Sequence, residues 1–196
     1  MRVYRRVFDE RVLVADVICT TGTADLLFPD HAKNFRQYGV LSLEVTPVDR
    51  PVIWKATCWF VDASVPAAGV ALVFCTFNRE HEITCVLQSI ASDAALVRRL
   101  SRIYLVNQGE PLLSSEFSAL RQRYGEKLEI IVQANFGGAG GFTRGLIEAL
   151  DNPTITHTVF LDDDIEVEPD SLFRMVSFFD LAKTDIVIGG QMLDGA

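Results

Sequence analysis

The stretch Thr158-Val159-Phe160-Leu161-Asp162-Asp163-Asp164-Ile165 decides the fold class, because a short, mostly apolar run leads directly into three carboxylates. A short apolar run of this kind predicts a buried strand, with the acids at its carboxyl end. In open α/β sheets, ligands bind at that edge. Neighbouring carboxylates repel one another and are retained where a cation such as Mg²⁺ or Mn²⁺ bridges them. Such ions leave positions for phosphate oxygens, so the stretch indicates a phosphate-bearing ligand, and a solvated acidic turn is the alternative.

A glycine-rich segment, Asn135–Phe142, lies upstream of the acids and follows the strand-like run Leu128–Val132. Glycines at a strand-to-helix junction let the backbone approach a ligand closely, and a helix N-terminus attracts an anion. The segment has neither the Lys-Ser/Thr of a Walker loop nor GxGxxG spacing, and a flexible turn is the structural alternative. The pattern that follows predicts a helix with one apolar face, made of Phe142, Leu146, Ile147 and Leu150.

A third strand-to-helix unit comes earlier in the chain. The apolar run Val70–Cys75 is followed by Thr76–Glu80, and then by a helical pattern of apolar residues at Ile83, Val86, Leu87 and Ile90. Asn78 is the predicted N-cap of that helix. Arg79 follows the strand end and is, taken alone, an ordinary exposed residue of a first helical turn.

Strands and helices alternate from residue 70 onward, which predicts βαβ units and a mainly parallel α/β sheet with helices on both faces. The expected strands are Val70–Cys75, Arg102–Val106, Leu128–Val132, Thr158–Leu161 and Ile186–Ile188. The expected helices cover residues 80–91, 114–124, 140–150 and 169–179, the last with Leu172, Met175, Val176 and Phe179 on one face.

Residues 1–65 predict a separate small β-rich module, joined by a linker at residues 61–69 to the domain formed by residues 70–196. Strand patterns cover Arg11–Cys19, Val40–Val45 and Val52–Cys58. Trp54 and Trp59 are expected to pack in its core, with carbohydrate contact as the alternative.

Composition limits the function classes. The chain has 196 residues, of which 49% are apolar, and a formal net charge of −8, which argues against nucleic-acid binding. No apolar run reaches the length of a membrane span and no signal peptide is evident, so we expect cytoplasmic localisation. The four cysteines lack metal spacing, and Cys58, Cys75 and Cys85 are predicted to be reduced core residues. The three histidines form no cluster.

Four segments in this order resemble the inverting GT-A glycosyltransferases of family 2, and most closely the galactofuranosyltransferase branch that builds bacterial cell-wall galactan. They are Val73–Arg79, Tyr104–Gly109, Asn135–Phe142 and Phe160–Pro169. The resemblance covers about Val70 to Asp194, and residues 1–65 match only loosely. It implies a GT-A, Rossmann-like nucleotide-sugar-binding domain.

The resemblance also implies roles for particular residues. Donor-binding positions are matched by Thr76, Phe77, Arg79, Gln108, Asn135 and Asp162. Asp162 and Asp164 would hold Mn²⁺ or Mg²⁺, while Asp163 would orient the turn. Many family members carry acidic residues where this chain has Asn107–Gly109, and that difference suits a galactofuranosyl donor better than UDP-glucose.

An inverting transferase needs a general base for the acceptor hydroxyl. In the resembled family that base, and a histidine that completes the metal site, lie downstream of the strand matching Ile186–Gly190. We therefore expect the chain to carry the donor-binding N-terminal part, without a catalytic base and inactive alone, and to expose surfaces that favour self-association.

The implied partners are a UDP-sugar donor and a glycan or lipid-linked acceptor, which leaves peripheral association with the inner face of the plasma membrane open. Two alternatives remain for the function. One is a rhamnosyltransferase that uses dTDP-rhamnose, and the other is a non-catalytic nucleotide-sugar-binding module.

Overall fold

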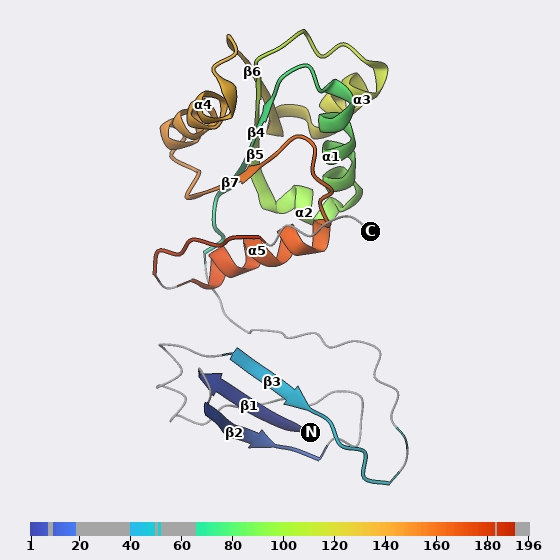
Figure 1. Cartoon of the computed structure of the whole chain (residues 1–196), viewed down its shortest axis with the longest axis vertical. Helices are drawn as coiled ribbons and strands as arrows, with labels where there is room; N and C mark the ends of the chain where they lie inside the picture. The colour runs from blue at the N-terminus through green and yellow to red at the C-terminus, as the bar shows by residue number, and fades with distance from the viewer. Residues whose placement is uncertain (8–9, 19–39, 50, 52–65, 183, 191–196) are drawn as a thin grey trace. The chain divides into compact units, whose positions relative to one another are not determined.

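The structure, a computed structural model, describes residues 1–7, 10–18, 40–49, 51, 66–182 and 184–190. The chain divides into two compact units, Met1–Phe60 and Val61–Ala196 (Figure 1). The predicted strand Val52–Cys58, Trp54, Trp59, Cys19 and Cys58 lie outside the described residues. None of the helices in the described ranges combines the length and apolar character needed to cross a bilayer.

The larger unit is built on a four-stranded parallel sheet with the order β6-β5-β4-β7, which confirms the predicted α/β class. Its elements are β4 (Val70–Thr76), α1 (Glu80–Ser92), α2 (Ala94–Arg99), β5 (Leu100–Asn107), α3 (Ser115–Tyr124), the 3₁₀ turn η2 (Gly125–Lys127), β6 (Leu128–Val132), α4 (Gly137–Asp151), β7 (His157–Leu161) and α5 (Pro169–Leu181). The chain runs outward from β4 to β6 and then returns to place β7 on the other side of β4. The topological switch point therefore lies between β4 and β7.

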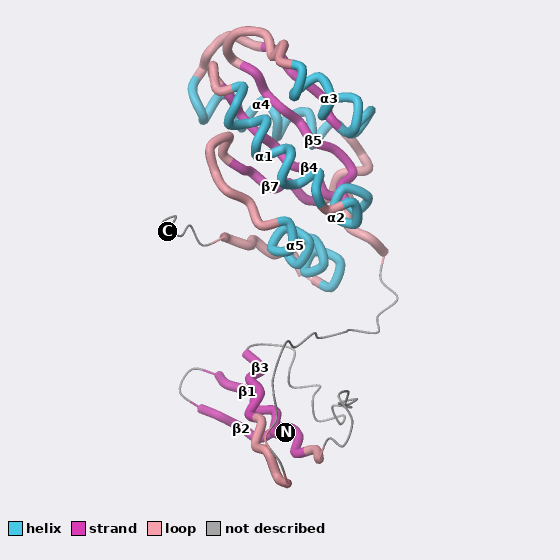
Figure 2. Tube along the Cα trace, turned by 90° about the vertical axis from the view of Figure 1, so that its right-hand side faces the viewer, coloured by secondary structure: helices cyan, strands magenta, loops and turns pink. Residues whose placement is uncertain are grey.

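Apolar side chains fill both faces of this sheet. One core packs residues of β4, β5, β6 and β7 against α1, α2, α3 and α5, and the predicted apolar face Ile83, Val86, Leu87 and Ile90 is fully part of it. The second core holds Val73, Tyr104 and Ala149 between the sheet and α4. Helices α1 and α3 cover one face of the sheet and α4 the opposite face (Figures 1 and 2).

Helix α4 differs from its sequence prediction. It starts at Gly137, and its buried residues are Gly141, Gly145 and Ala149 rather than the predicted apolar set. Ile147 and Leu150 are exposed. A Cβ at Gly145 would overlap Cγ1 of Val73, so the small residues let the helix axis approach β4 closely. Of the predicted set, Phe142 and Leu146 are half-buried, and Phe142 packs against the second core. Hydrophobicity alone missed the most buried face because it gives glycine no weight in packing.

Two other elements depart from the predictions. Helix α2 was not predicted, and Asp93 caps it by accepting from the backbone N–H groups of Ala95 and Leu96. The predicted strand Ile186–Ile188 is wrong, because that segment pairs with no strand in the described residues. Ile186 and Ile188 nevertheless pack against the larger core, while Val187 is fully exposed.

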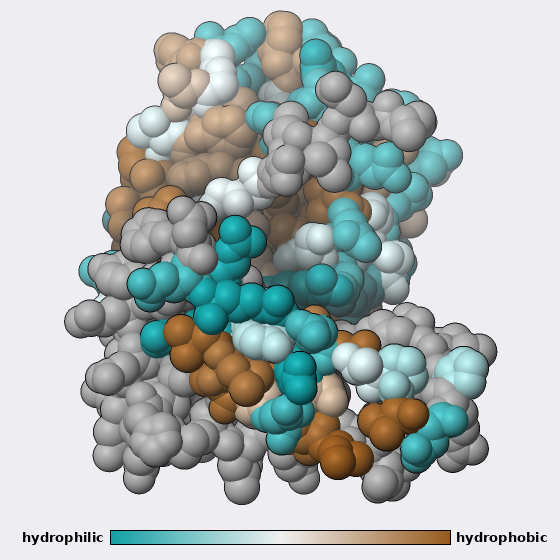
Figure 3. Space-filling view, turned by 60° about the horizontal axis from the view of Figure 1, so that its bottom comes forward, coloured by the Kyte–Doolittle hydropathy of each residue, from teal (hydrophilic) through white to brown (hydrophobic). Residues whose placement is uncertain are grey.

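The small unit is an antiparallel sheet with the order β2-β1-β3, made of β1 (Arg2–Val7), β2 (Glu10–Asp16) and β3 (Val40–Glu44). The sequence predicted β2 and β3 but not β1, whose arginines interrupt its apolar pattern. Exposed ion pairs link its strands, Arg2 to Asp16 at 3.0 Å and Arg11 to Glu44 at 2.8 Å. In the lower part of the view in Figure 3, apolar patches lie among polar ones. The exposed apolar residues of the small unit include Val12, Leu13, Ile18 and Val48.

Candidate functional site

The four sequence segments singled out above all follow carboxyl ends of the parallel strands. Thr76 ends β4 and residues 77–79 follow it, Gln108 follows β5, the glycine-rich segment follows β6 and the acidic turn follows β7. Helix α4 then crosses the sheet face, so that its Phe142 meets Phe160 of β7 edge-on with 5.6 Å between ring centroids. The strand order therefore gathers the four segments at one edge of the sheet, across the switch point.

The turn between β4 and α1 is fixed by its contacts with the loop after β5. Asn78 has a positive φ of 55°, and its Oδ1 accepts from the backbone N–H of Glu110 at 2.9 Å. A Cβ on Gly109 would overlap Asn78, so only glycine fits there. The predicted N-cap role of Asn78 is wrong, since Arg79 occupies the N-cap position without a side-chain cap. Asn78 instead joins two loops of the site.

Thr76 ends β4 with an unusual hydroxyl. Its residue surface is 1% exposed. Among the residues that the structure describes, its Oγ1 is the one buried side-chain oxygen or nitrogen without a hydrogen-bond partner. Such a group costs free energy unless something satisfies it, and the described protein groups leave this hydroxyl, at the carboxyl end of β4, unsatisfied.

Gln108 connects three parts of the site although it is buried. Its Nε2 donates to the Gly137 carbonyl and to Cys75 Sγ, both at 3.0 Å. Its Oε1 accepts from Gln133 Nε2 at 3.0 Å and from the Phe136 backbone N–H at 2.8 Å. All its hydrogen-bonding groups are thus used inside the protein. Its predicted contact with a donor stays a prediction, while the structure gives it the role of holding the glycine-rich segment.

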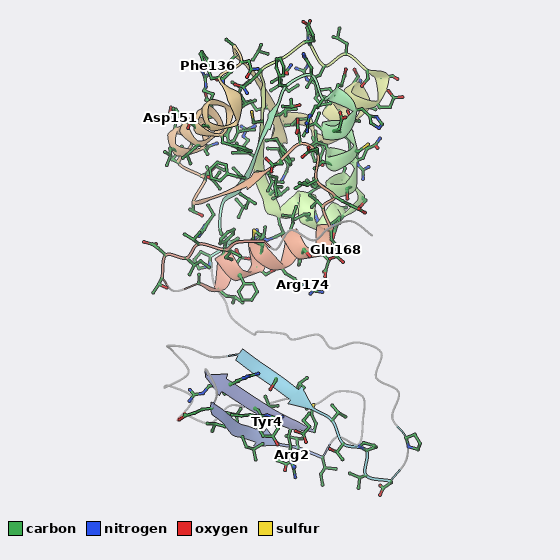
Figure 4. All side chains as sticks on the ribbon, in the orientation of Figure 1. Arg2, Tyr4, Phe136, Asp151, Glu168 and Arg174 are labelled. Carbon is green, nitrogen blue, oxygen red and sulfur yellow. The ribbon has the colours of Figure 1, made fainter. Side chains whose placement is uncertain are left out.

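The glycine-rich segment is an ordered turn that leads into α4. Asn135 Oδ1 accepts from the Gly137 N–H at 2.9 Å, and Gly137 has a φ of 70°, which favours glycine. A Cβ on Gly138 would meet nothing within 4 Å, so the space beside it is open. Phe136 is 68% exposed at the start of α4 (Figure 4). The turn thus presents an open backbone and an aromatic side chain to solvent.

The acidic turn after β7 places its three carboxylates in different surroundings. Asp162 and Asp164 are exposed, whereas Asp163 is buried. Arg79 Nη1 lies 3.5 Å from Asp163 Oδ1 and makes a closer ion pair with Asp164 Oδ2. The hydrogen bond to Asp164 and the charge of Asp163 raise the pKa of Arg79. This ion pair crosses the switch point from β4 to β7.

Cys75 lies between the glycine-rich segment and the acids. Burial, followed by the negative charge of Asp163, raises the pKa of its thiol. A Cβ on Gly141 would overlap its Sγ, so the thiol sits directly under α4. As a free, half-buried cysteine, Cys75 agrees in part with the prediction of a reduced core residue. Cys85 does not, because it is exposed on α1 and its Sγ lies 3.8 Å from His81 Nε2.

The donor set fits a hard cation, although it is incomplete. Carboxylate oxygens are the ligands that Mg²⁺ and Mn²⁺ prefer, and Asp162 and Asp164 are exposed. In the described parts of the chain, no three histidine, cysteine or acidic side chains meet as a ready metal site. Mg²⁺ is commonly held by one or two carboxylates together with substrate phosphates, so two carboxylates are compatible with a site that a ligand completes.

The structure therefore brings Arg79 to Asp164, and Gln108 to the glycine-rich segment that Asn135 begins. Phe77 is 48% exposed beside Thr76. Sequence reasoning missed Cys75, Gln133 and the loop-joining role of Asn78. The polar residues Gln133 and Asn78 at strand ends were the available signal, but their partners are far away in sequence.

A parallel α/β sheet with a glycine-rich turn and an acidic turn at its switch point is typical of α/β proteins that bind nucleotides. The family description "Glycosyl transferase family 2" matches residues 71–195. The chain belongs to glycosyltransferase family 2.

Two curated relatives are similar over most of this chain. It is 32% identical over 163 residues to galactofuranosyltransferase GlfT2 of Mycobacterium tuberculosis. The aligned residues make up 82% of this chain and 25% of that relative. It is 35% identical over 176 residues to galactofuranosyltransferase GlfT2 of Mycolicibacterium smegmatis. Here the aligned residues make up 88% of this chain and 27% of the relative. The chain thus spans about a quarter of the length of these relatives.

Proposed function

We propose that this chain binds UDP-galactofuranose and serves as the donor-binding part of an inverting galactofuranosyltransferase. The acceptor would be a cell-wall galactan or a lipid-linked glycan. The observation that carries the proposal is the unpartnered, buried Oγ1 of Thr76 at the switch-point edge, in a chain whose relatives are named galactofuranosyltransferases. A nucleotide would supply the hydrogen bond that this hydroxyl lacks.

The exposed residues around Thr76 suit the parts of a nucleotide diphosphate. The ring of Phe77 offers a face for stacking a base, and Arg79 offers a forked donor for phosphate oxygens. The open backbone at Gly138, at the start of α4, suits an anionic group. Gln108 would keep that backbone in place for the donor.

The proposed reaction is attack by an acceptor hydroxyl on the anomeric carbon of the sugar, from the side opposite to the departing UDP. A general base would take the hydroxyl proton as the new bond forms. Asp162 and Asp164 would hold Mg²⁺ or Mn²⁺, and such an ion, when bound, neutralises negative charge on a leaving diphosphate. Arg79 would add a second positive charge at the phosphates.

Calorimetric titration of UDP, with and without Mn²⁺, tests the donor site. The double variant Asp162→Asn, Asp164→Asn should lose the metal-dependent part of UDP binding. Asp170→Asn is the matched control, because Asp170 is an exposed acid on α5 whose partner is Arg174 on the same helix. Metal-coupled binding that stays unchanged in the double variant would contradict the proposed metal site.

Nucleotide competition tests the donor class. We expect UDP to bind more tightly than dTDP, and the reverse order would favour a dTDP-rhamnose donor. A transfer assay with UDP-galactofuranose and a galactan-like acceptor then separates an enzyme from a non-catalytic nucleotide-sugar-binding module.

A further inference from the structure

We propose that Arg79 is an internal counter-ion that competes with the divalent cation for Asp164 and yields that carboxylate when a nucleotide diphosphate arrives. Cation binding then depends on the nucleotide. This inference rests on the proposed function, because it takes the acidic turn as the cation site and the sheet edge as the nucleotide site.

Arg79 already occupies the part of the acidic turn where a metal ion would bind. Its guanidinium is paired with Asp164 and lies 3.5 Å from Asp163, so the positive charge of Arg79 neutralises part of the charge of two of the three consecutive carboxylates. A guanidinium that donates to Asp164 Oδ2 takes up part of that carboxylate's acceptor capacity and places a positive charge beside the remaining lone pairs, where a metal would bind. A divalent cation at Asp164 must therefore displace Arg79 or bind beside its positive charge, which repels the cation.

The exposure of the pair makes this displacement easy. The side chains of Arg79 and Asp164 are 49% and 50% exposed, while that of Asp163 is only 11% exposed. Ion pairs between exposed groups are weak because water screens them. Arg79 can thus leave Asp164 at low cost, whereas Asp163 keeps its place under the turn.

The backbone around Arg79 is held firmly, so the exchange needs only side-chain motion. The Arg79 carbonyl accepts from the Ile83 N–H at 3.1 Å in the first turn of α1. The next residue, Glu80, accepts from the Ser114 N–H at 2.7 Å through its Oε1. Because the Cα of Arg79 is fixed and its side chain is long and exposed, the guanidinium can point either toward the acidic turn or toward a nucleotide at the carboxyl ends of the strands.

A diphosphate is the natural second partner of this side chain. The planar fork of arginine matches phosphate oxygens, and two phosphates carry more charge than one carboxylate. The unpartnered Thr76 hydroxyl, three residues upstream, is an independent observation that favours a ligand at the same strand end. Binding of the diphosphate would free Asp164, and linkage requires that the cation tighten nucleotide binding by the same factor.

Mn²⁺ binding, followed by electron paramagnetic resonance, tests the inference without any catalytic readout. Without nucleotide, Arg79→Gln should bind Mn²⁺ about threefold to tenfold more tightly than the wild type, because a competing charge is gone. The tightening of Mn²⁺ binding that UDP causes should shrink in this variant. Arg174→Gln is the matched control, because the ion pair of Arg174 with Asp170 is also exposed and lies on α5, away from Phe136 (Figure 4).

The outcomes separate this inference from the proposed function. If Arg79→Gln binds Mn²⁺ no more tightly than the wild type, while the Asp162→Asn, Asp164→Asn variant loses Mn²⁺, the counter-ion role is refuted and the metal site stands. If the double variant binds Mn²⁺ as the wild type does, the metal site itself fails. A second readout is the Arg79 Nε NMR signal, which UDP with Mg²⁺ should shift and which should stay unmoved if Arg79 never leaves Asp164.

Discussion

At the scale of single residues, a change at Thr76 allows stability and nucleotide binding to be tested separately. Its buried hydroxyl has no partner, so Thr76→Val should leave the protein as stable or stabilise it by about 1 kcal/mol. The same change should weaken UDP binding by about threefold to tenfold, because one ligand hydrogen bond is lost. Thermal melts and calorimetry measure the two effects.

Thr84→Val is the control for that experiment. Thr84 is also buried, but its Oγ1 donates to the Glu80 carbonyl within α1. The change should therefore cost some stability and leave UDP affinity unaltered. A Thr76→Val protein with full UDP affinity would remove Thr76 from the proposed site.

Gln108 acts on the site through the backbone it holds. Gln108→Ala should lower the free energy of unfolding by about 1–3 kcal/mol, because it leaves buried groups unpaired. It should also speed hydrogen exchange at the Phe136 amide, which now donates to Oε1. Gln133→Ala is the control, since it removes one partner of Gln108 and leaves the Phe136 bond intact. Equal exchange at Phe136 in all three proteins would contradict this positioning role.

At the scale of elements, α1 and α5 could be predicted from the sequence because their apolar residues recur with helical spacing and are buried where expected. Helix α4 could not, because its contact face is made of small residues that carry no hydrophobic signal. The candidate site, like the helices, could be predicted only in part. The strand-end positions of Arg79 and Asp164 were predictable, but the partners of Gln108 come from loops that only the folded sheet brings together.

The close approach of α4 to β4 gives a prediction for Gly145. Gly145→Ala would place a Cβ against Val73, and we expect a loss of up to about 2 kcal/mol, since overpacking outweighs the better helix propensity of alanine. Combining it with Val73→Ala should cost less than the sum of the two single changes, because each relieves the other. Gly138→Ala, where the space is open, should be neutral or stabilising. Additive effects in chemical denaturation would show that Gly145 and Val73 are not coupled.

At the scale of the whole molecule, the four segments meet because the strand order returns β7 to the side of β4. The alternation of strands and helices predicted a parallel sheet, but it did not fix which strands are neighbours. The sheet order places Arg79 and the acids just beyond the carboxyl ends of adjacent strands and so makes their ion pair possible. Separate strand-end motifs become one site through this single topological step.

The division of the chain into two compact units predicts how it unfolds. Each unit has its own sheet, so calorimetry should resolve more than one transition. If the nucleotide site lies in the larger unit, UDP with Mn²⁺ at about 100 times its Kd should stabilise only that unit, by about 2.7 kcal/mol. For a domain of this size that is a rise of roughly 5–10 °C in one Tm, with the other unchanged. The Asp162→Asn, Asp164→Asn variant should lose the part of this shift that needs Mn²⁺. A single transition, or an equal shift of both, would show that the two units are coupled in folding.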